Sequence, residues 1–547
     1  MMLSGYPAVV PFLLMGFAVI ASMAWGRTGR AAMIAGMVLL TVGSWSGLRV
    51  ETAFLTAAAM VGVAVCVAGW RTGSEGLGTS ISLLAVFLML TGKGELLVSG
   101  YELYALGTFL MILSAGRPKT ARRYVVMNQV FGVIPLILAY ATGFRPLYVF
   151  PILFRAGLFP FHSWVPGVYG KIRAALTPVF MLGELVAFHM ALTAWPGQYC
   201  GYLFAVAGSV STFAALYSFR EIRLKKKFSY GSITDVGMAF FGLGGYWVTG
   251  REVMLYGSLL YILYQVLYKS AVFVGLSAVE HYGEEPNVCS IRKLLSAHLM
   301  SSLLYASSLA MAGVPPFASF VSRWMIYQGM SGAGVVLWLT FVPVVFLGAF
   351  PLASLLQLRS LGERICGRKV SVTKVPRGVV AVTGFLTVAS LTAPLSFALP
   401  SVRSLVSPPL AVVSALLMVS MLAFGWKLGR TPTERVSEIL LIFYSLGGIL
   451  RETAAFAVDL LRRAYLHGIV PVIKDVPGYE VPTLGSSMDA LDYETRHIDE
   501  AMFMPFVRAV ERASRWGTER NADMNVLMSG FAIAFAVLVV LVGIMLR

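Results

Sequence analysis

Residues 253–273 of this 547-residue chain read V-M-L-Y-G-S-L-L-Y-I-L-Y-Q-V-L-Y-K-S-A-V-F. About 20 consecutive apolar residues suffice for an α-helix to cross the hydrocarbon layer of a membrane, and this stretch has one formally charged side chain, Lys269. Tyr261, Gln265 and Lys269 are spaced by four residues, so they lie on one face of the helix. The stretch therefore predicts a membrane-crossing helix with a polar line that could carry a chain of water molecules.

Similar stretches recur along the whole chain. Its residues are 58% hydrophobic and 13% charged, which is too apolar for a soluble protein. The first stretch, residues 7–25, is too closely followed by others to be a cleaved signal peptide. Sixteen spans are predicted, beginning near residues 7, 31, 53, 77, 96, 124, 146, 174, 200, 230, 253, 299, 334, 377, 409 and 527. The predicted fold class is an all-α, polytopic membrane bundle.

The net charge of +17 follows the predicted topology. The odd-numbered short loops carry 22 Lys and Arg residues and the even-numbered ones carry five. Because cytoplasmic loops are rich in Lys and Arg, the odd loops are placed in the cytoplasm and the N-terminus outside a plasma membrane. The basic residues lie at helix ends rather than on one stripe with interleaved aromatic residues, so no nucleic-acid partner is expected.

The four cysteines at positions 66, 200, 289 and 366 lie far apart and form no Cys-x-x-Cys pair. Neither an iron–sulfur cluster nor a structural zinc site is therefore expected. We expect no cofactor, no metal site and no catalytic residue in this chain.

Residues 428–526 interrupt the pattern because they are too polar to span a membrane. Within them, residues 434–470 have apolar positions at helical spacing, which predicts an amphipathic helix of roughly 55 Å lying along the cytoplasmic membrane surface. Two interpretations stay open: a helix that caps its own bundle, and a brace across neighbouring subunits. A final span at residues 527–547 would anchor this lateral segment.

Ionisable residues inside the predicted spans are the candidates for function. Each costs roughly 2.5 to 3.5 kcal/mol at the middle of a helix on insertion scales, so each needs a partner, water or a role. His189 is the weakest candidate, because a lone histidine on an apolar face is more often packed than protonated. The candidates for an ion pathway are Glu102, Arg155, Glu184, His189, Asp235, Lys269 and Arg323, with Gln265 from the polar line.

Two spans also carry helix breakers. Gly157 and Pro160 lie in the seventh span, and Gly313, Pro315 and Pro316 lie in the twelfth. Proline removes a helical hydrogen bond and exposes carbonyl groups, which is tolerated at membrane depth where the backbone lines a hydrated cavity or is buried in protein. Broken helices beside buried charges favour an ion pathway.

Residues 155–166, R-A-G-L-F-P-F-H-S-W-V-P, resemble a signature of the antiporter-like subunits shared by respiratory complex I, multisubunit cation/proton antiporters and membrane-bound energy-converting hydrogenases. Residues 177–179, 221–235, 263–273 and 312–323 resemble further segments of the same family, in the family's order. The matches extend over residues 100–330 and are specific when taken together.

This resemblance implies a core of fourteen helices with two inverted five-helix repeats, in which helices 7 and 12 are broken. It also implies a lateral helix and a last membrane span beyond the core. The expected parts are N-terminal helices at 1–95, repeats at 96–220 and 221–357, C-terminal core helices at 358–427, the lateral segment at 428–526 and the last span at 527–547.

The resemblance also assigns positions. Glu102 matches the family's glutamate on the fifth helix and Arg155 its partner lysine on the seventh, so a buried pair between these two side chains is expected. Lys269 matches the central lysine and Arg323 the terminal lysine or glutamate.

Gln265 and Asp235 occupy positions where relatives often have histidine. The two arginines depart from the family pattern, because arginine keeps its proton in a protein whereas a buried lysine can lose it. They are expected to bias neighbouring groups or to act as gates rather than to relay protons.

These observations favour a subunit that translocates protons or sodium ions in a redox-driven complex of the energy-converting hydrogenase or complex I type. Its expected partners are the lipid bilayer, other membrane subunits and, through them, iron–sulfur and hydrogenase-like or quinone-reductase-like subunits. Three alternatives stay open: a subunit of a secondary cation/proton antiporter, a membrane subunit of an inorganic-carbon uptake system, and a structural brace that has lost conduction. The two arginine replacements support the brace.

Overall fold

The computed structural model describes residues 9–24, 26–43, 50–69, 73–194, 199–281, 285–287, 298–331, 333–356, 375–391 and 408–430. The lateral segment beyond residue 430 and the span predicted at residues 527–547 lie outside these ranges.

The described residues form helices and no strand, apart from an isolated antiparallel bridge between Arg223 and Asn287. The N-terminal helices are α1 (Val9–Ala24), α2 (Gly26–Gly43), α3 (Val50–Ala68), α4 (Ser74–Thr91) and α5 (Glu95–Ser114). The middle helices are α6 (Pro118–Asn128), the π-helix η2 (Gln129–Val133), α7 (Ile134–Thr142), η3 (Arg145–Tyr148), α8 (Val149–Ala156), α9 (Trp164–Tyr169), η4 (Ala174–Leu176), α10 (Thr177–Ala194), α11 (Tyr199–Ser211) and α12 (Ala214–Arg220). The later helices are α13 (Leu224–Thr249), α14 (Glu252–Glu280), α16 (His298–Ala312), α17 (Ala318–Gln328), α18 (Val335–Leu347), α20 (Arg377–Ser390) and α23 (Pro408–Arg430).

The all-α prediction is confirmed, and the first fifteen predicted spans each begin near an observed helix. The largest difference is six residues, for the spans predicted near residues 124 and 230, whose helices begin at Pro118 and Leu224. Eight helical stretches in the described part of the chain are long and apolar enough to cross a membrane. The fold is therefore the expected multi-pass membrane bundle.

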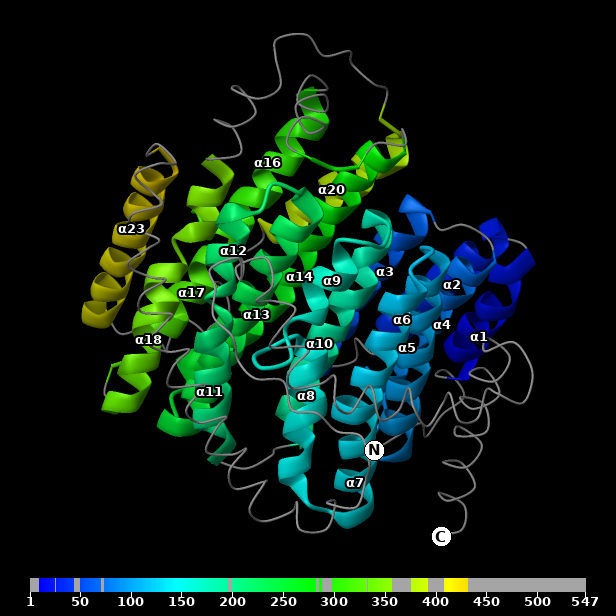
Figure 1. Ribbon diagram of the computed structural model, residues 1–547, viewed down its shortest axis with the longest axis horizontal. Helices are drawn as coiled ribbons and strands as arrows, with labels where there is room; N and C mark the ends of the chain where they lie inside the picture. The colour runs from blue at the N-terminus through cyan, green and yellow to red at the C-terminus, as the bar shows by residue number, and fades with distance from the viewer. Residues whose placement is uncertain are drawn as a thin grey trace, which may run out of the picture. The chain divides into compact units, whose positions relative to one another are not determined.

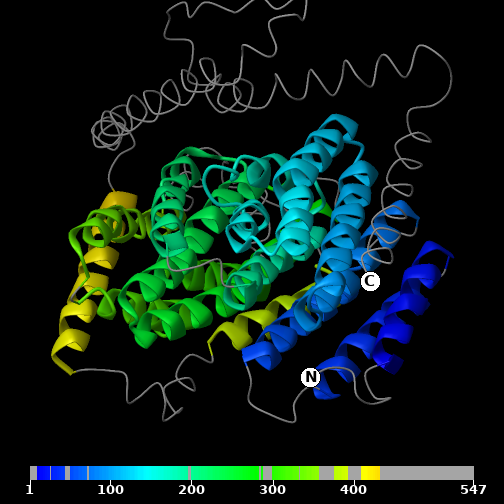
Figure 2. The same ribbon diagram turned by 90° about the horizontal axis from the view of Figure 1, so that it is seen from below.

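Helix α14 lies at the centre of this bundle. It packs against α3, α10, α13, α16, α17 and α20, and Figure 1 shows it in the middle of the helices. Figure 2, seen from below, places α1 and α2, drawn in dark blue, at an edge. The most apolar windows of α10 and α14 are 94% and 83% buried, so polar side chains on these two helices face protein rather than lipid.

The first predicted break interrupts the seventh span. Helix α8 ends at Ala156, Gly157 adopts a φ of 64° in the left-handed region, and α9 begins at Trp164. Glycine tolerates this conformation because it has no Cβ atom. Between the two helices, the backbone N–H of Phe159 donates to Ser211 Oγ at 2.9 Å. Helix 7 is therefore broken, as its glycine and proline predicted.

The second predicted break interrupts the twelfth span, between α16 and α17. Gly313 follows the last residue of α16 and has a φ of 72°. A Cβ atom at this position would lie 2.8 Å from Arg323 Nη1. Glycine is thus required by the backbone conformation and by the guanidinium group beside it. Helix 12 is also broken where it was expected.

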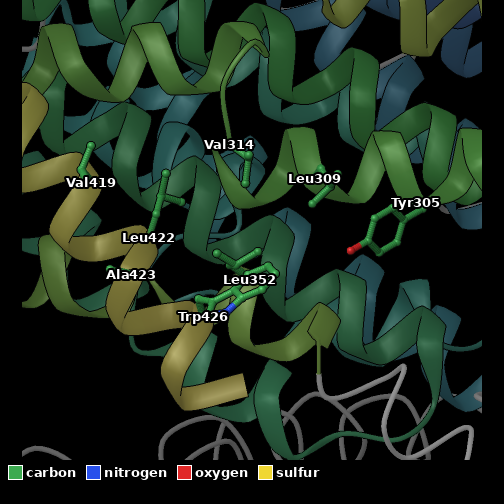
Figure 3. A pocket seen from close by; sticks show the side chains of 8 residues that line it. All are labelled: Tyr305, Leu309, Val314, Leu352, Val419, Leu422, Ala423 and Trp426. Carbon is green, nitrogen blue, oxygen red and sulfur yellow. The ribbon is translucent and has the colours of Figure 1, made fainter. Parts of the chain in front are cut away.

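An apolar pocket of about 330 Å³ lies beside this second break (Figure 3). Its walls come from α16, the break itself, the helical residues 350–356 and α23, and they carry almost no polar surface. The lining side chains are Tyr305, Leu309, Val314, Leu352, Val419, Leu422, Ala423 and Trp426. The pocket is therefore chemically distinct from the buried ionisable residues described next.

Candidate ion pathway

Lys269 lies on α14 at the centre of a buried polar network and is 1% exposed. Its Nζ donates to the backbone oxygen and to the Oγ of Ser232 on α13, at 3.0 Å each. It also donates to Gln265 Oε1, one turn earlier on its own helix. Asp235 Oδ2 lies 3.6 Å and Glu184 Oε2 3.9 Å from the same nitrogen. One amine thus lies between two carboxyl groups.

Glu184 connects α10 to this centre. Its Oε1 accepts hydrogen bonds from Tyr169 at 2.9 Å and from Ser232 Oγ at 2.8 Å. Its Oε2 accepts from Gln265 Nε2 at 3.2 Å. Since Ser232 and Gln265 also accept from Lys269, two side chains bridge the carboxyl group to the amine.

Asp235, on α13, lies on the other side of Lys269 and is fully buried. Its carboxylate accepts from Tyr261 at 2.7 Å and from Tyr268 at 3.0 Å. It also accepts from Arg323 Nη2 at 3.3 Å. This carboxylate therefore joins the central lysine to the arginine of the second broken span.

Arg323 is the last member of the network, and it also donates hydrogen bonds to backbone carbonyls at the broken helix. The last carbonyl groups of an α-helix have no partner within the helix, and here Met311 and Ala312 at the end of α16 accept from Arg323 at 3.0 and 3.1 Å. Gly348 O accepts at 3.2 Å, and the Tyr261 hydroxyl accepts at 2.9 and 3.0 Å. Every nitrogen of this guanidinium group is bonded.

The network joins two potential anions and two potential cations through α10, α13, α14 and α17. Burying a charge costs several kcal/mol unless it is paired and hydrogen-bonded, and each of the four groups has both kinds of partner. Charges this close are strongly coupled, so a change of charge on one group alters the electrostatic energy of the others. This property is what a stepwise ion pathway requires.

Arg155, on α8, lies in a separate site. Its Nη1 donates to Tyr124 Oη at 3.0 Å and its Nη2 to Asn128 Oδ1 at 2.8 Å. The guanidinium carbon lies 4.2 Å from the ring centroid of Tyr101 and 4.5 Å from that of Tyr104. Both distances lie within the range of cation–π attraction. The positive charge is therefore stabilised by aromatic rings and neutral oxygens.

The expected direct pair between Glu102 and Arg155 is wrong. Glu102, on α5, is half-buried and accepts from Gln129 Nε2 at 3.2 Å, while the terminal nitrogens of Arg155 go to Tyr124 and Asn128. The physical reason is that neutral polar groups meet both charges: Tyr124 and Asn128 of α6 bond Arg155, and Gln129, the first residue of the π-helical turn η2, bonds Glu102.

Three buried atoms between these side chains have no hydrogen-bond partner in the described part of the chain: Glu102 Oε1, Asn128 Nδ2 and Arg155 Nε. Buried polar atoms in proteins are nearly always bonded to protein or to water. Unbonded polar atoms are therefore found on the glutamate, on the arginine and on the asparagine that bonds the arginine, and π-helical turns such as the neighbouring η2 are frequent at functional sites.

His189 stands outside the network. It lies on α10 and is 6% exposed, and its ring packs edge-on against Phe54 with centroids 5.4 Å apart. Neither ring nitrogen has a hydrogen-bond partner within the described residues. His189 is therefore packed rather than bonded into the network, as expected for the weakest candidate.

The sequence-based list omitted several residues of the site. Tyr268 bonds Asp235, Tyr169 bonds Glu184, and Tyr124 and Asn128 hold Arg155. Helical spacing offered one signal: Tyr268 is two turns after Tyr261, so the two hydroxyls can reach one carboxylate. The described residues contain no cluster of three or more His, Cys, Asp or Glu side chains suited to a metal ion.

Known proteins resemble the part of the chain that contains this site. Residues 68–348 match the family model described as NADH:quinone oxidoreductase/Mrp antiporter, transmembrane. The chain is 24% identical over 342 residues to NADH-quinone oxidoreductase subunit N of Rhodobacter capsulatus, covering 58% of this chain and 70% of that protein. It is 27% identical over 323 residues to a hydrogenase-4 component F homolog of Methylacidiphilum infernorum, covering 54% of this chain and 61% of that protein.

The fold is also similar to a solved structure. A chain of the Mrp complex from a Dietzia species superposes with a TM-score of 0.58 and 16% sequence identity, covering 78% of this chain and 98% of that one. The likeness concerns the fold. The family match, residues 68–348, contains all eight candidate residues, from Glu102 to Arg323.

Proposed function

Since the chain belongs to the NADH:quinone oxidoreductase/Mrp antiporter transmembrane family and is an antiporter-like, multi-pass membrane subunit, we propose that it moves protons or sodium ions within a redox-driven complex of the energy-converting hydrogenase or complex I type. The observation that carries the proposal is the buried line from Glu184 through Lys269 and Asp235 to Arg323. A bundle that served only as a scaffold has no need of four ionisable groups in its apolar centre.

Lys269 is the group on which transfer depends. It is 3.6 Å from Asp235 and 3.9 Å from Glu184, distances too long for direct hydrogen bonds. A proton therefore passes between the amine and either carboxyl group through a water molecule, through Ser232 or Gln265, or after a small movement of the side chain. Lys269 is the positive partner that both carboxyl groups share, so a change in its charge alters the electrostatic energy of each of them.

The two arginines act as fixed charges in this scheme. Arginine remains protonated in proteins, so Arg323, 3.3 Å from Asp235, places a fixed positive charge at the end of the network and does not relay a proton beyond it. Arg155 supplies a constant positive field at the side of the network nearer α5. The three unbonded polar atoms of Glu102, Asn128 and Arg155 support a hydrated branch of the pathway beside them.

The finer assignments belong to the same proposal. The N-terminus would face outside, the odd-numbered loops and the lateral segment of residues 428–526 would lie in the cytoplasm, and the lateral segment would contact a neighbouring membrane subunit. Iron–sulfur and hydrogenase-like or quinone-reductase-like subunits would carry the electrons. Co-purified chains with iron–sulfur motifs would support the redox complex, whereas a complex without them would favour a secondary antiporter.

The proposal is tested by substituting Lys269 in the intact complex reconstituted in liposomes. Lys269→Arg fixes the positive charge, and Lys269→Met removes it while keeping similar bulk. Both variants should lose coupled ion uptake while the complex remains assembled. A lysine that merely pairs with carboxylates would tolerate arginine, so normal flux with Lys269→Arg would exclude Lys269 from the pathway and favour the structural brace.

A further inference from the structure

A second cavity, which is polar, lies apart from the buried network. It is found where four segments of the chain meet at the ends of their helices. Its volume is about 190 Å³. Five of its wall residues are cationic and one is a carboxylate. The wall consists of Arg117, Gly170, Lys171, Arg223, Lys225, Lys226, Glu285 and Pro286. The cavity is therefore strongly basic.

Carboxylates in the described residues offset only part of this charge. Glu221 pairs with Arg223 at 3.1 Å, and Glu280 pairs with Lys225 at 2.8 Å. Together with Glu285 in the wall, three negative groups face five positive ones. The described part of the chain thus leaves an excess of positive charge around this cavity.

Lys171 shows that the cations repel one another. Burial lowers the pKa of its side chain, and the nearby charges of Lys226, Arg117 and Arg123 lower it further. Its Nζ donates to Thr120 Oγ1 at 2.9 Å, which is a neutral acceptor. An anion in the cavity would relieve this repulsion.

Two helix N-termini add to the positive potential. Arg117 is the N-cap residue of α6 and Arg223 is that of α13, and neither cap has a side-chain hydrogen bond. The N-terminal end of a helix carries a partial positive charge, which favours anions and disfavours cations there. The sequence nevertheless places Lys225 and Lys226 in the first turn of α13. Cations are thus kept where they are unfavourable for the helix itself.

All of the wall residues lie on one side of the membrane by the charge rule. Arg117, Lys171, Lys225 and Glu285 fall in four different odd-numbered loops of the predicted topology. Beside Arg223, Ile222 is 53% exposed, and Tyr217 at the end of α12 is 43% exposed. An apolar surface therefore adjoins the basic cavity at the level where the bundle leaves the membrane.

We propose that this cavity binds the phosphate group of an anionic phospholipid. Basic pockets at the cytoplasmic ends of membrane helices suit such headgroups, and Ile222 and Tyr217 offer a surface on which an acyl chain can pack. The phosphate would face Arg117, Lys171 and Lys226, which come from three segments separated in sequence. Bound lipid would hold α6, the loop after α9 and the start of α13 together.

The test uses the whole purified complex, delipidated in detergent, with native mass spectrometry to count bound lipids. The probes are phosphatidylglycerol, phosphatidylcholine and inorganic phosphate. The variant is the double substitution Arg117→Ala with Lys171→Ala, and the matched control is Lys119→Ala with Arg122→Ala, which removes two exposed cations of α6 outside the wall.

The wild type and the control should retain phosphatidylglycerol, and the double variant should bind it about tenfold or more weakly, since each basic residue near the surface contributes appreciably. Phosphatidylcholine should be retained less by all of them. Unchanged binding in the double variant, or an equal loss in the control, would overturn the site. Displacement of the lipid by inorganic phosphate at comparable concentration would overturn the lipid assignment.

Discussion

The two broken spans each hold a buried arginine, but the two arginines are satisfied in different ways. Arg155 lies in α8, before the first break, and Arg323 lies in α17, after the second. All the nitrogens of Arg323 are bonded, with Asp235 and three backbone carbonyls among their acceptors. Arg155 makes two hydrogen bonds to neutral groups, lies over two tyrosine rings and leaves its Nε without a partner in the described residues.

This difference in hydrogen bonding suggests different roles for the two arginines, both of which keep their positive charge. Arg323 supports structure and function together, since it caps the end of α16 and holds Asp235 of the central network. Arg155 sits in a looser polar site whose neighbours, Glu102 and Asn128, also have unbonded atoms. We therefore expect rigidity at the second break, and hydration at the first.

The largest expected loss of stability comes from removing Arg323, the arginine whose nitrogens are all hydrogen-bonded. Arg323→Ala removes the guanidinium partner of Asp235 and the donor to three buried backbone carbonyls, and breaking a buried charge pair in this way costs about 3–5 kcal/mol. Arg155→Ala should cost less, because it breaks two hydrogen bonds to neutral acceptors. Thermal unfolding of the two purified variants compares them directly. An Arg155→Ala variant as unstable as Arg323→Ala would contradict the distinction.

An intermediate effect is expected at the glycine of the second break. Gly313 and Gly143 have nearly equal φ angles of 72° and 69°, so alanine introduces similar backbone strain at both. At Gly313 the new Cβ meets Arg323 Nη1, whereas at Gly143 it meets no atom within 4 Å. Gly313→Ala should therefore be less stable than Gly143→Ala by about 1–3 kcal/mol, the usual cost of overpacking. Equal melting temperatures would show that the guanidinium can move aside.

The smallest effect is expected in a comparison of two double-mutant cycles. Asp235 and Arg323 are 3.3 Å apart, so their coupling energy should lie well within the range of about 0.5–3 kcal/mol seen for residues in contact. Glu102 and Arg155 are each bonded to other side chains, so their coupling should be smaller. Stability cycles with Asn or Gln replacing the carboxylates and Met replacing the arginines measure both. A coupling energy for Glu102 and Arg155 larger than that for Asp235 and Arg323 would show that the first two side chains interact directly.

Much of the fold could be predicted from the sequence, because hydrophobic length marks each helix and glycine and proline mark each break. The breaks at Gly157 and Gly313 can be predicted from residue type alone, since glycine and proline in the middle of a span interrupt its helical hydrogen bonds. The cost of burying charge was enough to single out Glu184, Asp235, Lys269 and Arg323 without knowledge of their neighbours.

The pairing of these residues could not be predicted in the same way. Glu184 and Gln265 are hydrogen-bonded but lie 81 positions apart in the sequence, and Arg323 and Asp235 lie 88 apart. No local sequence pattern predicts contacts over such separations. The Glu102–Arg155 prediction was wrong because Tyr124 and Asn128, on a helix between them in sequence, bond the arginine. These residues are uncharged, so the cost of burying charge does not single them out. His189 had the right residue type and depth, yet it packs on Phe54 away from the network.

Whether the buried network carries ions can be decided by measuring ion uptake into liposomes by the intact complex with Glu184→Gln. Its matched control is Glu280→Gln, which removes a carboxylate that pairs with Lys225 away from the network. Glu184→Gln should lower coupled uptake at least about tenfold in a fully assembled complex, while Glu280→Gln should retain most of it. Normal uptake with Glu184→Gln would show that the network does not carry ions.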